Sequence, residues 1–200
     1  MKFTLPLLAL SGIALAATTP PPLADDRPLC EIADEWAQNN VGNLPTTLDG
    51  ILSYDRTYQR AIFNNSPRST QVGFWREHLG RFVETHNELT LDQASFLTGL
   101  SENLEVYFDA GDDRTSVEAL EADARELLGD KLAAAAIANL GESNQLSVAA
   151  APGGCSCSVG SDWCTGINTD CLAGGCDRTS SGCGTLWLFN CDGNCKLNPT

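Results

Sequence analysis

Eight of the nine cysteines of this 200-residue chain lie between Cys155 and Cys195, and this cluster limits what the C-terminal part can become. The surrounding stretch is rich in Gly, Ser and Asp and has few other apolar residues, so it cannot bury enough surface to fold without cross-links. An even number of cysteines in such a segment predicts four disulfides, although the sequence does not choose among on the order of a hundred pairings. The predicted disulfide residues are Cys155, Cys157, Cys164, Cys171, Cys176, Cys183, Cys191 and Cys195.

A metal centre is the alternative reading of this cluster. Zinc sites use paired ligands, most often Cys-x-x-Cys knuckles, and frequently histidine. The spacing here contains no Cys-x-x-Cys pair, and neither histidine lies in the cluster. We therefore expect no metal ligands and no metal cofactor in this segment.

The N-terminus predicts the oxidising compartment that disulfides need. Residues 1–17 carry one positive charge at Lys2, then an apolar run, and end in the small-residue pattern Ala14-x-Ala16. These features are typical of a secretory signal peptide, and the run is shorter than the ~20 residues that span a bilayer. We expect a secreted, extracellular protein without a stable transmembrane segment in the mature chain. A Pro-rich linker is expected over residues 18–29.

Between this linker and the cysteine cluster, the pattern is helical. Val72, Trp75, Leu79 and Phe82 recur at intervals of three and four residues, as on the buried face of a helix. Thr90 with Gln93 has the form of a capping box, and Thr115 with Glu118 repeats it.

The predicted fold is therefore an all-α domain over residues 30–141, a small multi-helix bundle, followed by a flexible linker over residues 142–154. Residues 155–200 are expected to form a small disulfide-rich domain that is mostly irregular or β. Cys30 stays outside the cluster, and its role is open between a buried thiol, a partner for another chain and a competitor for the cluster.

The charge excludes some partners. The net charge is −14, so neither nucleic acid nor an anionic lipid surface would attract the chain. Catalysis also lacks a basis: His78 and His86 are eight residues apart on one predicted helix, and no nucleophile motif accompanies them. We expect no catalytic residues, no cofactor and no enzymatic activity.

The segment "GCGTLWLFNC" is the predicted binding element. If it is an extended strand, alternate side chains face opposite ways, so Trp187 and Phe189 would point together to one side. Because a small disulfide core cannot enclose four bulky side chains, at least one aromatic is expected to be exposed for binding a target. Trp163 beside Cys164 has the same character, and the alternative is that all these rings only shield disulfides.

Several of these segments together resemble a known family. The elements "LPTT", "YQRAIF" and "WREHL", followed by a tail with Cys-x-Cys, "SDWC" and "GCGTLWLFNCDGNC", are similar to the fulvocin C-related bacteriocins over roughly Leu44 to Cys195. The resemblance implies a secreted bacterial protein whose cysteine-rich tail is antibacterial and acts on an unknown target at the bacterial cell surface.

Two functions follow from these observations. In the first, the cysteine-rich part is the effector of a bacteriocin-like precursor, and the helical domain is its carrier or pro-region. In the alternative, the chain is a secreted, non-catalytic binding module that holds a surface polymer or receptor through Trp163, Trp187 and Phe189.

Overall fold

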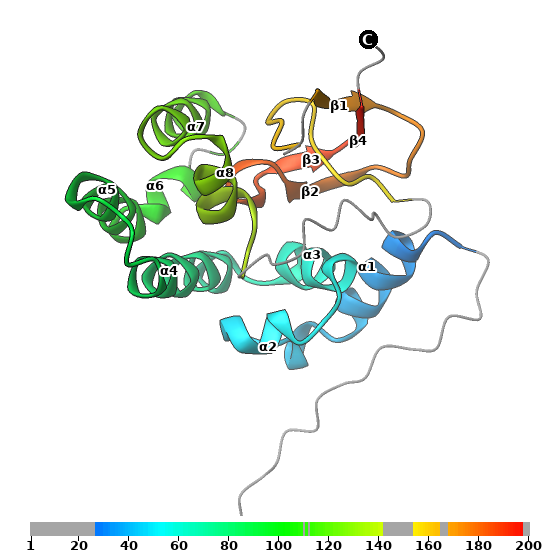
Figure 1. Cartoon of the computed structure of the whole chain (residues 1–200). Helices are drawn as coiled ribbons and strands as arrows, with labels where there is room; N and C mark the ends of the chain where they lie inside the picture. Colours follow the sequence, from blue (N-terminus) through cyan, green and yellow to red (C-terminus); the bar gives the residue numbers. More distant parts are fainter. Residues whose placement is uncertain (1–26, 110, 112, 142–153, 165–167, 198–200) are drawn as a thin grey trace, which may run out of the picture.

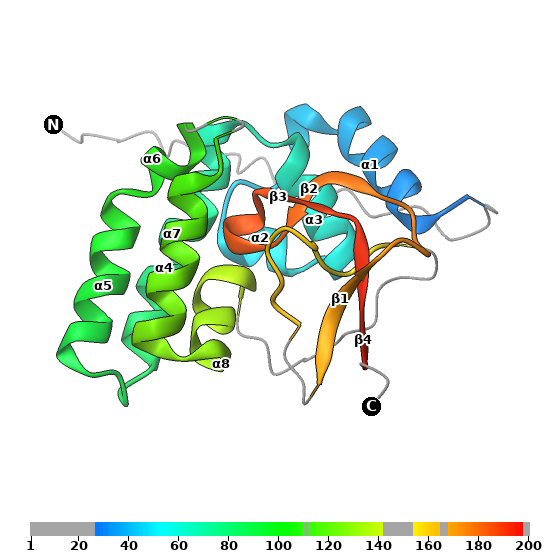
Figure 2. The same cartoon turned by 90° about the horizontal axis from the view of Figure 1, so that it is seen from above.

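The structure, a computed structural model, describes residues 27–109, 111, 113–141, 154–164 and 168–197. An N-terminal helical region is followed by a cysteine-rich region with short antiparallel strands. This arrangement confirms the predicted fold class. Figure 1 shows strand β2 (Thr179–Cys183) lying against helix α3 (Arg56–Asn65), and Figure 2 shows the same contact from above.

Eight α-helices make up the helical region within the described residues. Helix α4 is the central one, because it contacts α2, α5, α6 and the turn η2. Its predicted apolar face is buried. The helices are α1 (Leu29–Asn39), α2 (Leu48–Leu52), α3 (Arg56–Asn65), α4 (Arg68–Thr85), α5 (Leu91–Glu102), α6 (Leu104–Asp109), α7 (Thr115–Leu128) and α8 (Asp130–Ala133), with a 3₁₀ turn η1 (Val41–Asn43) after α1 and a π-helical turn η2 (Ala134–Ala138) after α8.

The helix starts agree only partly with the sequence prediction. Thr90 and Gln93 form the predicted capping box, with both reciprocal hydrogen bonds present. The second box is wrong: Thr115 is already the first helical residue of α7, and its N–H donates to the carboxylate of Asp113. An aspartate two residues upstream therefore accepts from the Thr115 N–H, which the side chain of Glu118 was expected to cap.

Two small antiparallel pairs form the cysteine-rich region. Strand β1 (Thr169–Ala173) pairs with β4 (Gly193–Leu197), with Cys171 opposite Cys195. Strand β2 (Thr179–Cys183) pairs with β3 (Phe189–Cys191), and the 3₁₀ turn η3 (Thr185–Trp187) joins them. All eight cysteines of the cluster form disulfides, as predicted: Cys155–Cys176, Cys157–Cys171, Cys164–Cys195 and Cys183–Cys191.

The two regions share one hydrophobic core. Leu186 and Trp187 of the cysteine-rich region belong to the same buried cluster as the apolar residues of the helices. The cysteine-rich region adds only a small second cluster, formed by Cys155, Cys183 and Cys191. Because a region this small has little interior of its own, it uses the helical region to bury its largest side chain.

Some predictions fall outside the described residues. These are the signal peptide over residues 1–17, most of the linker over residues 18–29, and all but the last residue of the linker over residues 142–154. In the part of the chain that the structure describes, no helix has both the length and the apolar character needed to cross a membrane.

Candidate functional site

The contact between the two regions is centred on residues 184–188, which we call the tryptophan loop. The loop follows Cys183, and the disulfide from Cys183 to Cys191 closes the chain around it. Gly184, Leu186 and Trp187 all have positive φ angles, of 69°, 53° and 58°. Two consecutive non-glycine residues in the left-handed region are unfavourable by themselves, so contacts outside the loop must hold them.

The Trp187 side chain supplies the strongest of these contacts. It is 1% exposed, and its ring packs edge-on against Phe63 of α3 and Trp75 of α4, at centroid distances of 5.3 and 6.1 Å. The indole Nε1–H donates to the carbonyl of Ala138 in η2 at 3.0 Å. An indole is thus both buried and hydrogen-bonded, and the helical region provides every one of these partners.

His78 of α4 orders the segment that receives Trp187. Its Nδ1 accepts a hydrogen bond from the Gly141 N–H at 3.2 Å, so Nε2 carries the proton that faces the carbonyls of Ala135 and Ala136. A π-turn leaves carbonyls without their usual helical donors, and this imidazole satisfies two of them. Burial lowers the pKa of His78 to about 4, which keeps the ring neutral. Both ring nitrogens are occupied by backbone, so neither is available for proton transfer to a substrate.

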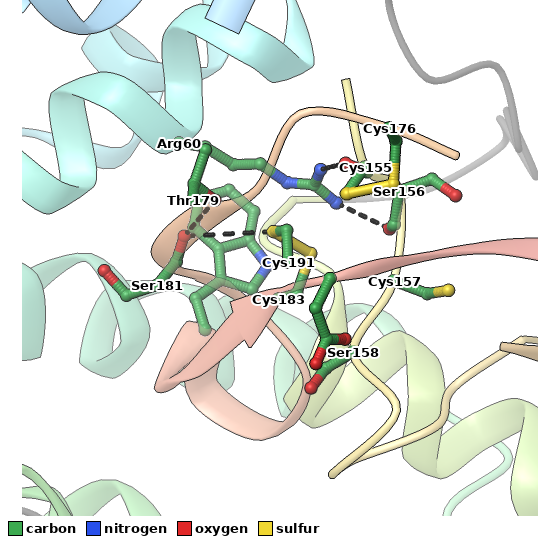
Figure 3. Close-up of a disulfide and its surroundings, with 12 residues drawn as sticks. Arg60, Cys155, Ser156, Cys157, Ser158, Cys176, Thr179, Ser181, Cys183 and Cys191 are labelled. Atoms are coloured by element: carbon green, nitrogen blue, oxygen red, sulfur yellow. Dashed lines mark hydrogen bonds between the residues drawn. A yellow bond between two sulfur atoms is a disulfide. The ribbon is translucent and has the colours of Figure 1, made fainter. Parts of the chain in front are cut away.

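Arg60 of α3 holds the start of the cysteine-rich region. Its guanidinium donates to the carbonyls of Cys155 and Ser156 at 3.1 and 3.0 Å, beside the Cys155–Cys176 disulfide (Figure 3). Burial, and then the charge of Arg56, lower the pKa of Arg60 to about 9. The side chain therefore remains charged at neutral pH, and its positive charge is stabilised by backbone carbonyls.

Glu121 of α7 forms the polar contact on the other side of the tryptophan loop. Its Oε2 accepts hydrogen bonds from the hydroxyls of Ser161 and Thr185, at 2.5 and 2.8 Å. Its Oε1 accepts from Arg125 at 2.9 Å. Thr185 Oγ1 in turn accepts from the indole of Trp163 at 2.9 Å. One carboxylate thus fixes two hydroxyls of the cysteine-rich region.

The exposure predicted for Trp187 and Phe189 is wrong. Phe189 is 8% exposed, and Trp163 is only half-buried, so none of the three aromatics is fully exposed. Residues 185–187 form a tight turn, in which Leu186 and Trp187 have positive φ, instead of an extended strand, and both side chains join the core of the helical region. In the intact chain, the helical region covers the rings on which the alternative function, a binding module, depended.

Two other sequence features have structural explanations. The sulfur atoms of Cys157, Cys164 and Cys171 lie within 4.8 Å of one another, but each is bonded in a disulfide, so two neighbouring disulfides account for the grouping. Cys30 is a free, half-buried thiol on α1. Its burial, and the nearby carboxylate of Asp177, raise its pKa, which disfavours the reactive thiolate.

Sequence reasoning missed the arginines and the glutamate of this contact. Arg60 and Glu121 resemble any other surface residue of an acidic helical region, and no local pattern marks them. The only signal was the pair of glycines at 182 and 184, which favours a turn before "TLWLF". Comparisons of the chain with protein-family models, with curated proteins and with solved structures found no match.

Proposed function

We propose that this protein is a secreted, bacteriocin-like precursor in which the cysteine-rich region is the antibacterial effector and the helical region keeps it inactive. The observation that carries the proposal is the burial of Trp187 among Phe63, Trp75 and Ala138 of the helical region. An isolated cysteine-rich region has no comparable interior, so its release would present this ring to a target.

The disulfides are consistent both with export of the protein and with its storage as an inactive precursor. Four disulfides are typical of small proteins outside the cytosol, and they would preserve the cysteine-rich region after release. All four join cysteines within residues 155–195, so no disulfide ties the effector to the helical region. A cut between residues 141 and 154 therefore removes the last covalent link between the two.

The resemblance to fulvocin C-related bacteriocins supports an antibacterial activity, and a component of the bacterial cell surface is the proposed target. The buried tryptophan supports a target that is recognised by apolar contact. Tryptophan is the residue type most often found at the energetic centre of protein interfaces.

The test is growth inhibition by three preparations of the same oxidised protein. A protease site placed within residues 142–153 allows the intact chain, the purified helical region and the purified cysteine-rich region to be compared. We expect inhibition by the cysteine-rich region and none by the intact chain or the helical region. Inhibition by the helical region, or equal inhibition by the intact chain, would contradict the proposal.

A matched pair of variants tests latency. Adding the wild-type helical region back should suppress the inhibition, because it covers Trp187 again. A helical region with Phe63→Ala should suppress it less. Phe96→Ala should behave as wild type, since Phe96 lies beside Leu100 and Tyr107 and is not one of the rings that pack against Trp187.

A further inference from the structure

Each aromatic residue of the cysteine-rich region lies under an arginine of the helical region. The region contains three such residues, and each has a guanidinium carbon over its ring: Arg56 over Trp187 at 5.4 Å, Arg114 over Phe189 at 5.6 Å and Arg125 over Trp163 at 3.8 Å. These are cation–π distances. The arginines come from different places in the fold, namely α3, the residue before α7, and α7 itself.

Two of these arginines are not engaged by acidic groups. Within the residues that the structure describes, no ion pair joins Arg56 or Arg114 to a carboxylate, although the helical region is rich in carboxylates. Arg125 does pair with Glu121 and Asp130, and it also donates to the carbonyl of Asp162 next to Trp163. Arg56 and Arg114 thus each face an aromatic ring.

The helical region is acidic overall, yet many of its few basic side chains lie at the contact with the cysteine-rich region. Residues 27–141 contain nine basic and nineteen acidic side chains. Four of the nine basic ones, at positions 56, 60, 114 and 125, contact the cysteine-rich region. The cysteine-rich region itself has four aspartates against one arginine and one lysine. At the contact itself, cations of the helical region meet aromatic rings and backbone carbonyls of the cysteine-rich region.

Within the cysteine-rich region, other residues hold Phe189 and Trp163 in ways that leave the ring faces covered by arginine free for a ligand. Phe189 packs on one side beside Gly184 and Gly160 of its own region, and Arg114 covers it from the helical side. The Trp163 indole is fixed by its bond to Thr185, while Arg125 covers its ring. Removal of the helical region uncovers both faces, and the disulfide from Cys183 to Cys191 still closes the chain around residues 184–188.

We propose that the cysteine-rich region recognises a protein partner through arginine side chains that stack on Trp163, Trp187 and Phe189, and that the helical region occupies this surface with its own arginines. This inference rests on the proposed release of the cysteine-rich region. It adds the chemistry of the partner: guanidinium groups on a protein surface. Because a guanidinium is planar and stacks on rings, arginine is preferred over lysine.

The experiment uses the cysteine-rich region cleaved from the full-length, oxidised chain, separated from the helical region in urea without reductant, and returned to native buffer. The probes are three Gly/Ser peptides of equal length that carry three arginines, three lysines or three citrullines, and binding is followed by tryptophan fluorescence. We expect the arginine peptide to bind most tightly and the citrulline peptide, which has the same shape but no charge, not to bind. Equal binding of arginine and citrulline peptides, or no binding of the arginine peptide, would overturn the inference.

Two variants assign the binding to the rings. Trp163→Leu and Phe189→Leu should each weaken arginine binding roughly two- to five-fold, since one cation–π contact is lost. Lys196→Gln, which removes an exposed cation and leaves all three rings in place, should not weaken it. The masses before and after reduction must show four intact disulfides in each variant. Undiminished binding by both ring variants would attribute the affinity to the aspartates and overturn the inference.

Growth inhibition by the same samples separates this inference from the proposed function. Inhibition without arginine binding would leave the antibacterial role intact and refute the arginine-bearing partner. Arginine binding without inhibition would support the recognition surface and refute the antibacterial role.

Discussion

At the scale of single residues, His78 makes the stability of the fold depend on pH. Its folded-state pKa of about 4 lies below the ordinary value of 6.5 because the ring is buried, and the charge of Arg56 opposes protonation further. Between these two values the unfolded chain binds a proton that the folded chain does not. Stability is therefore complete above about pH 6.5 and is lost as the pH falls toward 4.

The corresponding prediction compares unfolding at two pH values. For the intact, oxidised protein, the free energy of unfolding in urea should fall by about 2 kcal/mol between pH 7.5 and pH 5. His78→Gln keeps a polar side chain that does not titrate, so it should lose less than half of this amount. If the variant and the wild type lose the same free energy, His78 is not the source of the acid sensitivity.

At the scale of elements, the tryptophan loop depends on a glycine. A Cβ atom at Gly184 would lie 2.7 Å from Cβ of Ser161 and 2.8 Å from the Phe189 ring, and the φ of 69° already disfavours any other residue. Gly174 has a similar φ of 82°, but a Cβ there would meet no atom within 4 Å. A side chain at position 184 would therefore add a steric clash to the backbone strain, whereas a side chain at position 174 would add backbone strain alone.

We therefore expect Gly184→Ala to be considerably more destabilising than Gly174→Ala. The second variant should cost only the backbone term, about 1–2 kcal/mol, whereas the first adds a clash with a buried ring and displaces the loop from the helices. Thermal unfolding of the two oxidised variants measures the difference. Equal melting temperatures would show that the loop has room to adjust.

The sequence predicts elements better than it predicts their contacts. Regular apolar spacing was sufficient to predict helix α4 and its buried face. The reciprocal pair Thr90 and Gln93 was sufficient to predict where α5 begins. The expectation for Trp187 failed because it treated "TLWLF" as an isolated strand with only disulfides to cover it. The residues that cover it, Phe63 and Trp75, lie more than a hundred positions earlier, and no local pattern links them to a cysteine-rich tail.

At the scale of the whole molecule, the two regions share one hydrophobic core, and each supplies a different kind of side chain to their contact. The helical region contributes apolar interior and cations, and the cysteine-rich region contributes a rigid, cross-linked loop. Their contact includes a fully buried tryptophan, hydrogen bonds that Arg60 and Asn64 donate, and a hydrogen bond that Glu121 accepts from Thr185. A contact of this kind does not require the peptide chain between the regions to hold it together.

The most direct test of this account is the association state of the chain after one cut within residues 142–153. We predict that the two pieces of the wild-type protein sediment as one particle under native conditions at micromolar concentration. The same cut in Trp187→Ala should let the pieces separate, because truncating a buried tryptophan at the centre of a contact commonly costs about 2 kcal/mol or more. Trp163→Ala, at the half-buried edge, should remain associated. Immediate separation of the wild-type pieces would contradict the claim that the helical region holds and covers the cysteine-rich region.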